Sequence, residues 1–236
     1  MVDLIVLGAT FAAAGIAQNY KENCLVLEHG SQAGYEFFGA LNFGRDTLKP
    51  ATQKEAFDLQ MNIANGGIYG GERHIYPCFQ NANILFQTDV VSVEQTDGHF
   101  VCVTHGIDGF ATYEARAVID TRCRDAMCLS KTYNLLMESP ETPVFSGATT
   151  KRAPGENRYI LCCAVPKDCS YPEARDIARR IIQQFSGDQT LILSADVFDY
   201  SVKTDYPKTE KGIYYLPSKA CENPALAFEA GLEVAV

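Results

Sequence analysis

Residues 3–30, DLIVLGATFAAAGIAQNYKENCLVLEHG, constrain the fold more strongly than any other part of the chain. The apolar runs 4–7 and 24–27 are continuous rather than alternating, which is typical of strands covered on both faces in a parallel sheet. Gly8 permits a tight turn after the first run, and the alanine-rich segment 12–20 is compatible with a helix. The stretch therefore predicts a strand–helix–strand unit with parallel strands.

The turn of this unit matches two of the three positions of the dinucleotide-binding fingerprint G-x-G-x-x-G/A. Gly8 supports the turn, and Ala13 allows close packing of helix on strand. Thr10 stands where a glycine normally lets the backbone approach a pyrophosphate, and its hydroxyl is able to donate to a phosphate. Glu28 follows the second strand, twenty positions after Gly8, where a carboxylate meets ribose hydroxyls. Two interpretations stay open: a dinucleotide site or a purely structural unit.

The middle of the chain predicts a helix, a loop and an antiparallel meander. Residues 50–64 have a proline near the start and one apolar face, which favours a helix, and the glycine-rich segment 65–77 favours a loop. Residues 84–86 suit a third parallel strand. Asp-Gly pairs separate three alternating segments, which predicts hairpins through 90–95, 100–105 and 110–115. A further buried strand is expected at 117–120.

From about residue 140 the pattern changes to strands around one amphipathic helix, 171–185. The expected strands lie at 142–149, 159–165, 191–195 and 197–202. The chain returns to a strand at 212–216 and a final helix with Asn223 as N-cap and Pro224 in the first turn. We therefore expect an α/β fold with a dinucleotide-binding domain, residues 1–135 and 205–236. A small α+β substrate or cap lobe is expected at 136–204.

Composition excludes several functional classes. The net charge is -9 and no lysine- or arginine-rich run occurs, so nucleic-acid binding is not expected. No apolar segment approaches the roughly 20 residues that cross a bilayer. Nine cysteines without an export signal predict a reducing cytoplasm. They form no C-x-x-C pair, and the four histidines are not at ligand spacing, so no metal site is predicted.

The order of these elements, with a "VID-T" strand end and a terminal strand–turn–NP–helix, resembles the FAD-dependent oxidoreductases of the glutathione-reductase-like, two-dinucleotide-binding-domain type. The resemblance implies a Rossmann-like FAD-binding domain in which Glu28 binds the adenosine ribose. It places the pyrophosphate at the turn, the adenine at a meander backbone and the flavin at the terminal helix. The implied cofactor-binding residues are Gly8, Ala9, Thr10, Ala12, Glu28, Val91, Thr121, Asn223, Pro224 and Ala225.

Three positions depart from that family pattern. Thr10 replaces a glycine, Cys123 replaces the glycine of the family's "ATG" turn, and residues 217–219 lack the acid that holds the ribityl chain. Two functions therefore remain: an FAD-dependent oxidoreductase transferring hydride or electrons to or from an unknown small molecule, or a non-catalytic relative that binds another nucleotide or a protein partner. The sequence assigns no catalytic residue, substrate, electron partner or oligomeric state.

Overall fold

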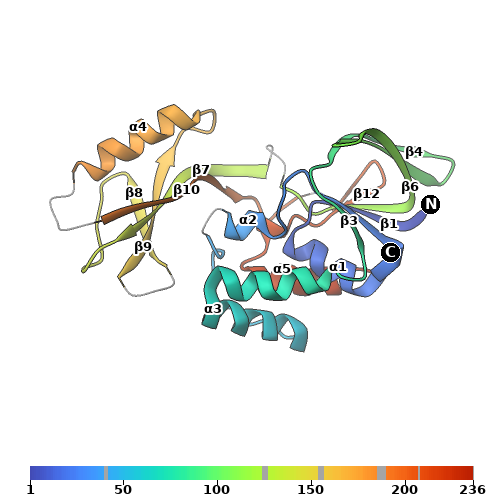
Figure 1. Ribbon diagram of the computed structural model, residues 1–236, viewed down its shortest axis with the longest axis horizontal. Helices are drawn as coiled ribbons and strands as arrows, with labels where there is room; N and C mark the ends of the chain where they lie inside the picture. The colour runs from blue at the N-terminus through green and yellow to red at the C-terminus, as the bar shows by residue number, and fades with distance from the viewer. Residues whose placement is uncertain (40–41, 124–126, 154–156, 185–189, 207, 236) are drawn as a thin grey trace. The chain divides into compact units, whose positions relative to one another are not determined.

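The computed structural model describes residues 1–39, 42–123, 127–153, 157–184, 190–206 and 208–235. The chain divides into two compact units. The first comprises Met1–Phe37, Phe43–Arg124 and Thr204–Val236, and the second comprises Phe38–Asn42 and Asp125–Lys203. Each unit has a sheet of its own (Figure 1). Among the described residues, no helix is both long and apolar enough to cross a membrane.

A mixed sheet forms the centre of the first unit, with the strand order β11-β12-β6-β1-β2-β3. Its strands are β11 (Thr209–Glu210), β12 (Ile213–Tyr215), β6 (Gly109–Asp120), β1 (Val2–Leu7), β2 (Cys24–Leu27) and β3 (Asn83–Leu85). The strands from β12 to β3 run parallel. All four residues of β2 are buried, as the continuous apolar run predicted.

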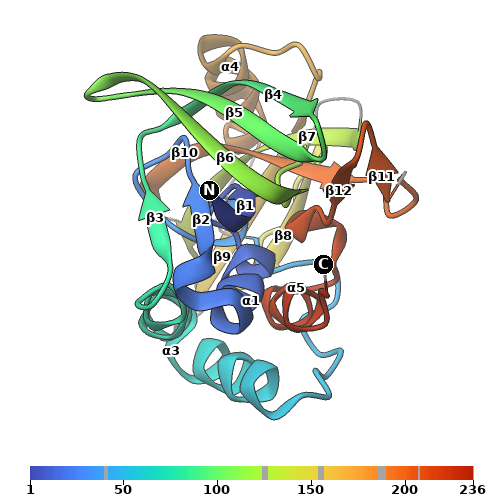
Figure 2. The same cartoon turned by 90° about the vertical axis from the view of Figure 1, so that its right-hand side faces the viewer.

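The strand β6 belongs both to this parallel sheet and to the meander of β4 (Asp89–Thr96) and β5 (His99–Gly106). Its first half pairs antiparallel with β5, and its second half pairs parallel with β1. Figure 2 shows β4, β5 and β6 as the long strands on one side of the unit. The two segments expected at 110–115 and 117–120 are thus one strand, which pairs with β5 along its first half and with β1 along its second half.

The segments around the parallel strands also form helices. They are α1 (Phe11–Tyr20), α2 (Tyr35–Phe38), α3 (Lys54–Cys78) and α5 (Pro224–Leu232), with short 3₁₀ turns η1 (Lys21–Asn23) and η3 (Ser218–Ala220). Helices α1 and α5 lie side by side (Figure 2). The predicted loop at 65–77 is wrong: the segment is helical, and the glycine-rich run marks only a kink at Gly67, where φ is 56°. Asn62 contacts His74 across this kink, and a Cβ on Gly70 would lie 1.9 Å from the Asn62 carbonyl oxygen, so the two halves of α3 pack closely.

The second unit is an antiparallel sheet covered on one face by α4 (Tyr171–Ile182). The strand order is β10-β7-β9-β8, with β10 (Thr190–Val202), β7 (Cys128–Glu138), β9 (Arg158–Val165) and β8 (Ala148–Arg152). The expected strand at 142–149 begins only at residue 148, and the two expected at 191–202 are one. Residue 185, the last of the predicted helix, lies outside the described residues.

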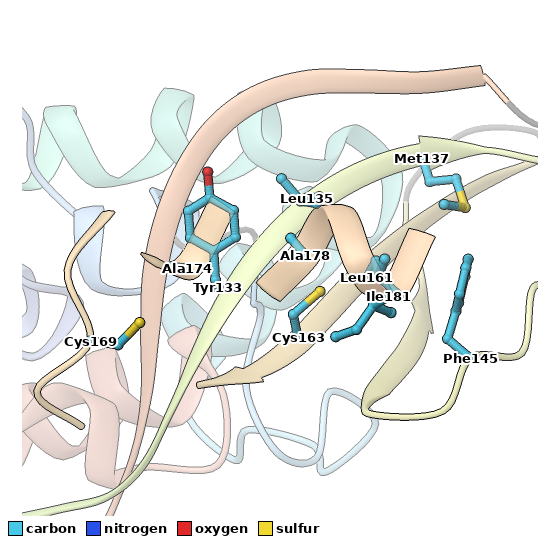
Figure 3. Close-up of a cluster of buried hydrophobic side chains, with 10 residues drawn as sticks. All are labelled: Tyr133, Leu135, Met137, Phe145, Leu161, Cys163, Cys169, Ala174, Ala178 and Ile181. Carbon is cyan, nitrogen blue, oxygen red and sulfur yellow. The ribbon is translucent and has the colours of Figure 1, made fainter. Parts of the chain in front are cut away.

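The core of the second unit lies between α4 and this sheet (Figure 3). The buried cluster consists of Tyr133, Leu135, Met137, Phe145, Leu161, Cys163, Cys169, Ala174, Ala178 and Ile181. Alternate residues of β7 point into it, yet polar residues between them obscured this strand in the sequence. A capping box of Ser170 and Glu173 starts α4. The predicted fold class is confirmed: a parallel sheet with an antiparallel meander, and a smaller α+β unit.

Candidate functional site

The carboxyl ends of four parallel strands meet at one edge of the first unit's sheet, beside the N-terminus of α1. Gly8 follows β1, Glu28 follows β2, Thr121 follows β6 and Ser218 lies just beyond β12. In open α/β sheets, ligands bind in the crevice outside the carboxyl ends of the strands. Most of the predicted cofactor-binding residues lie at this edge or in the first turn of α1, including the buried Ala12.

The turn between β1 and α1 is tight and closely covered. Gly8 has φ at 91° and donates its N–H to the Leu27 carbonyl over 2.8 Å. A Cβ on Gly8 would lie 2.6 Å from Cγ of Arg122, so glycine is required both for backbone angle and for space. Thr10 is the N-cap of α1, and its Oγ1 accepts the Ala13 N–H at 3.1 Å. The hydroxyl oxygen of Thr10 thus accepts a hydrogen bond from the helix that it caps.

Two backbone bonds hold the carboxylate of Glu28 at the end of β2. Its Oε2 accepts the Ala9 N–H at 2.7 Å, and its Oε1 accepts the Gly30 N–H at 2.6 Å. A carboxylate oxygen has two lone pairs, so each oxygen keeps one for a further donor. Glu28 is half-buried, so its carboxylate stays accessible to a ligand at the sheet edge.

A second carboxylate, that of Glu36 in α2, lies at the N-terminus of α1. Its Oε1 accepts the Phe11 N–H at 2.8 Å and the Ser218 hydroxyl at 2.7 Å. Lys219 donates from Nζ to the Glu36 main-chain carbonyl at 2.8 Å and lies 4.8 Å from the centre of the Phe37 ring. Burial raises the pKa of Glu36, and the bonds from Phe11 and Ser218 oppose that rise.

The residues after β6 are engaged with the sheet edge. The Arg122 guanidinium binds both oxygens of the buried Asp120 carboxylate, at 2.9 and 3.1 Å. The Thr121 hydroxyl lies 2.9 Å from the Leu7 carbonyl and 3.1 Å from the Gly8 carbonyl. Thr121 therefore directly follows β6 with its hydroxyl turned toward the end of β1, and its contact with a cofactor stays a prediction.

The start of α5 is covered by the segment 44–49. Asn223 caps the helix by accepting the Leu226 N–H at 3.0 Å, as predicted. Its amide nitrogen donates to the carbonyls of Asp46 and Lys49, at 2.9 and 3.0 Å. Pro224 and Ala225 form the buried first turn. The amide nitrogen and oxygen of the Asn223 side chain are thus both hydrogen-bonded to backbone groups of this chain.

Val91 lies in β4 and is 57% exposed. The strand begins close to Glu28, because Thr88 N–H donates to the Glu28 carbonyl and Gln87 N–H to the Gly30 carbonyl. Glu36 and Asp120 belong to the same edge but were missed as site residues in the sequence, whereas Ser218 and Lys219 were considered there only as positions that lack an acid. The sequence around Glu36, residues 31–48, is rich in glycine and aromatic residues and has no helix or strand periodicity that would single out an acid. In the described part of the chain, no cluster of three or more His, Cys, Asp or Glu residues is arranged to hold a metal ion.

Comparison with known proteins identifies the fold. No protein-family model matches the chain, and no curated protein matches it. Among solved structures, the anhydrotetracycline hydroxylase OxyS from Streptomyces rimosus is similar, with TM-score 0.62 and 10% identity over 97% of this chain and 60% of its own. A geranylgeranyl bacteriochlorophyll reductase-like protein from Thermoplasma acidophilum has TM-score 0.62 and 11% identity, over 98% of this chain and 76% of its own.

The hydroxylases are longer than this chain. CabE, an aromatic hydroxylase from angucycline biosynthesis, has TM-score 0.60 and 13% identity over 98% of this chain, which spans 61% of that structure. At such identities the similarity shows the fold alone: the Rossmann-like α/β fold that this chain shares with these hydroxylases and the reductase-like protein. This chain spans about 60% of the length of several of the similar structures.

Proposed function

We propose that this chain is an FAD-dependent oxidoreductase-like protein whose first unit binds the nucleotide end of FAD beside Gly8 and Glu28. The observation that carries the proposal is the Glu28 carboxylate, held by Ala9 and Gly30 at the carboxyl end of β2. Its remaining lone pairs suit the two hydroxyls of a ribose. The residues at this end of the site fit an adenosine group.

The remaining assignments follow the resemblance stated for the sequence. The turn residues Gly8, Ala9, Thr10 and Ala12 would face the pyrophosphate, and the backbone at Val91 would contact adenine. Thr121 would contact the cofactor from the turn that corresponds to the family's "ATG" turn. The α5 start, Asn223 to Ala225, would border the flavin, and the second unit would serve as a substrate or cap lobe. When bound, FAD supplies hydride or electron transfer, and the chain binds and orients it. The glutathione-reductase-like subtype and the small-molecule substrate remain predictions.

Two observations favour the alternative, a relative that does not use FAD. The Glu36 carboxylate binds the Phe11 N–H, a donor at the helix end that would face a pyrophosphate. The segment 44–49 contacts the start of α5, where the flavin would lie, through Asn223 and the Glu222 carbonyl. This alternative predicts that the full chain shows no saturable binding of FAD.

A titration of FAD with the purified full chain, followed by FAD fluorescence polarisation, tests the proposal. We expect saturable binding that weakens about tenfold or more in Glu28→Ala, because hydrogen bonds to a charged group are lost. Glu22→Ala removes an exposed carboxylate from the neighbouring turn η1 and should leave the affinity unchanged. Equal affinity of the Glu28 and Glu22 variants would refute the assignment of Glu28, and absence of binding to wild type and to Glu36→Gln would refute the function.

A further inference from the structure

We propose that Glu36 is an internal occupant of the phosphate end of this site, which a dinucleotide must displace in order to bind. The proposal rests on the proposed function for the identity of the ligand. It goes further because it makes Glu36, a residue outside the fingerprint, the determinant of how strongly an anionic ligand binds.

The geometry around Glu36 is that of a bound anion. Donors converge on its Oε1 from two different segments: the Phe11 N–H at the start of α1 and the Ser218 hydroxyl in η3. The N-terminus of a helix attracts negative charge through its free N–H groups and its dipole. The carboxylate thus makes contacts of the kind that a phosphate oxygen makes at this position in dinucleotide-binding folds.

The position of Glu36 is determined by the fold. The Gly34 N–H donates to the Ala9 carbonyl at 2.8 Å, and the Phe37 N–H donates to the Gly34 carbonyl at 3.2 Å. The first bond joins the start of α2 to the turn between β1 and α1, and the second closes the turn of α2 itself. The Glu36 carboxylate reaches the start of α1 from there. Thr10 satisfies the Ala13 N–H but leaves the Phe11 N–H for another acceptor, and Glu36 supplies that acceptor.

Glu36 also answers a question raised by residues 217–219, which lack the acid of the family pattern. An acid does lie beside Ser218 and Lys219, but it comes from α2. In the family pattern the corresponding acid binds the cofactor's ribityl chain, whereas here the carboxylate binds α1. The acid and the phosphates of a dinucleotide therefore compete for the same donors, and their like charges repel.

The charged and titratable groups around Glu36 decide how pH acts on this competition. They are Lys219 and Cys221 from η3 and its end, and Cys123 after β6, together with the polar contacts of Phe11 and Ser218. Lys219 is the cation among them, and its ammonium binds the main-chain carbonyl of Glu36. Because protonation of Glu36 removes the repulsion, binding of a phosphate group takes up a proton, and affinity rises as pH falls.

The decisive variant is Glu36→Gln, which keeps the size of the side chain and an acceptor oxygen but removes the charge. By FAD fluorescence polarisation we expect it to bind FAD at least about tenfold more tightly than wild type at neutral pH. The wild-type affinity should rise as pH is lowered, whereas that of the variant should stay level. Glu22→Gln makes the same charge change at an exposed position and should behave as wild type. Glu36→Ala serves as a second variant should the glutamine variant fold poorly.

Inorganic pyrophosphate is the second probe, read by the rise in melting temperature that it causes. If the Glu36 variants gain stability from pyrophosphate but do not bind FAD, the inference stands and the proposed function falls. If wild type and Glu36→Gln bind FAD equally, the function stands and the inference is overturned. If neither ligand binds the Glu36 variants more tightly than it binds wild type, Glu36 is only a structural contact.

Discussion

Gly15 of α1 lies against the backbone of Phe228 in α5, so closely that a Cβ on Gly15 would be 2.1 Å from the Phe228 carbonyl oxygen. The contact is reciprocal, since a Cβ on Gly231 would be 2.0 Å from the Ala12 carbonyl oxygen. Real Cβ atoms do not approach this closely, and the obstacle is backbone that has no rotamer to change. The first helix and the last helix are therefore packed backbone to backbone beneath the proposed site.

Gly15→Ala should lower the free energy of unfolding by about 1–3 kcal/mol, because overpacking outweighs the gain in helix propensity. Gly66→Ala is the matched control: Gly66 lies in the helical part of α3, and a Cβ there would meet no heavy atom within 4 Å. It should be neutral or stabilise by up to about 1 kcal/mol. Urea unfolding followed by circular dichroism measures both, and a Gly15 variant as stable as wild type would contradict the close packing.

Glu229→Ala should destabilise the protein by about 2 kcal/mol, because the α5 carboxylate accepts bonds from Thr52 N–H, Thr52 Oγ1 and Gln53 N–H at 2.6–2.7 Å. Burial by itself raises the pKa of the Glu229 carboxyl. The three hydrogen bonds lower it by more than that, so its pKa lies below the ordinary value. The carboxylate therefore stabilises the fold above its ordinary pKa, and this contribution is lost as pH falls through the lower folded value.

The same unfolding measurement at several pH values checks this sign. The difference between wild type and Glu229→Ala should be largest near neutral pH and shrink in acid. Glu233→Ala, at the exposed C-cap of the same helix, should change stability by less than about 0.5 kcal/mol. A difference that grows in acid would mean that the pKa of Glu229 is shifted upward.

Thr121→Val should cost about 1–2 kcal/mol, because the hydroxyl joins the end of β6 to the Leu7 and Gly8 carbonyls at a buried position. Thr112→Val, at an exposed position of the same strand, is the control. If Thr121 has only this structural role, the FAD affinity of the Thr121 variant should match that of wild type. Equal stability of the two variants would show that the hydroxyl bonds contribute nothing.

Glu36→Gln should be more stable than wild type at neutral pH, since burial raises the pKa of Glu36 above its ordinary value of 4.5. The unfolded chain loses this proton first as pH rises, so wild type loses stability between pH 4.5 and the folded pKa. The advantage of the variant should thus vanish at pH values below 4.5 and reach a plateau above the folded pKa. Thermal melts of both proteins across pH check this, and Glu22→Gln should show no such trend.

Much of the fold could be predicted because its signals are local. The continuous apolar runs 4–7 and 24–27 predicted parallel strands, and the two Asp-Gly pairs predicted the hairpins of the meander. Asn223 followed by Pro224 predicted the start of α5. The prediction failed at 65–77, where glycines favoured a loop, but the chain is helical on both sides of a kink at Gly67 and its two halves pack closely at Gly70.

The candidate site was predictable only in part. By itself, the sequence determined the strand ends that carry Gly8, Glu28 and Thr121, because hydrophobic runs and turn residues act over a few neighbouring positions. Only the tertiary structure decided which groups bind there. Glu36 reaches Phe11 from 25 positions along the chain, and Ser218 reaches Glu36 from 182, and no local pattern records such pairings. Local sequence patterns thus determine where the site lies, whereas long-range packing determines that Glu36 binds there.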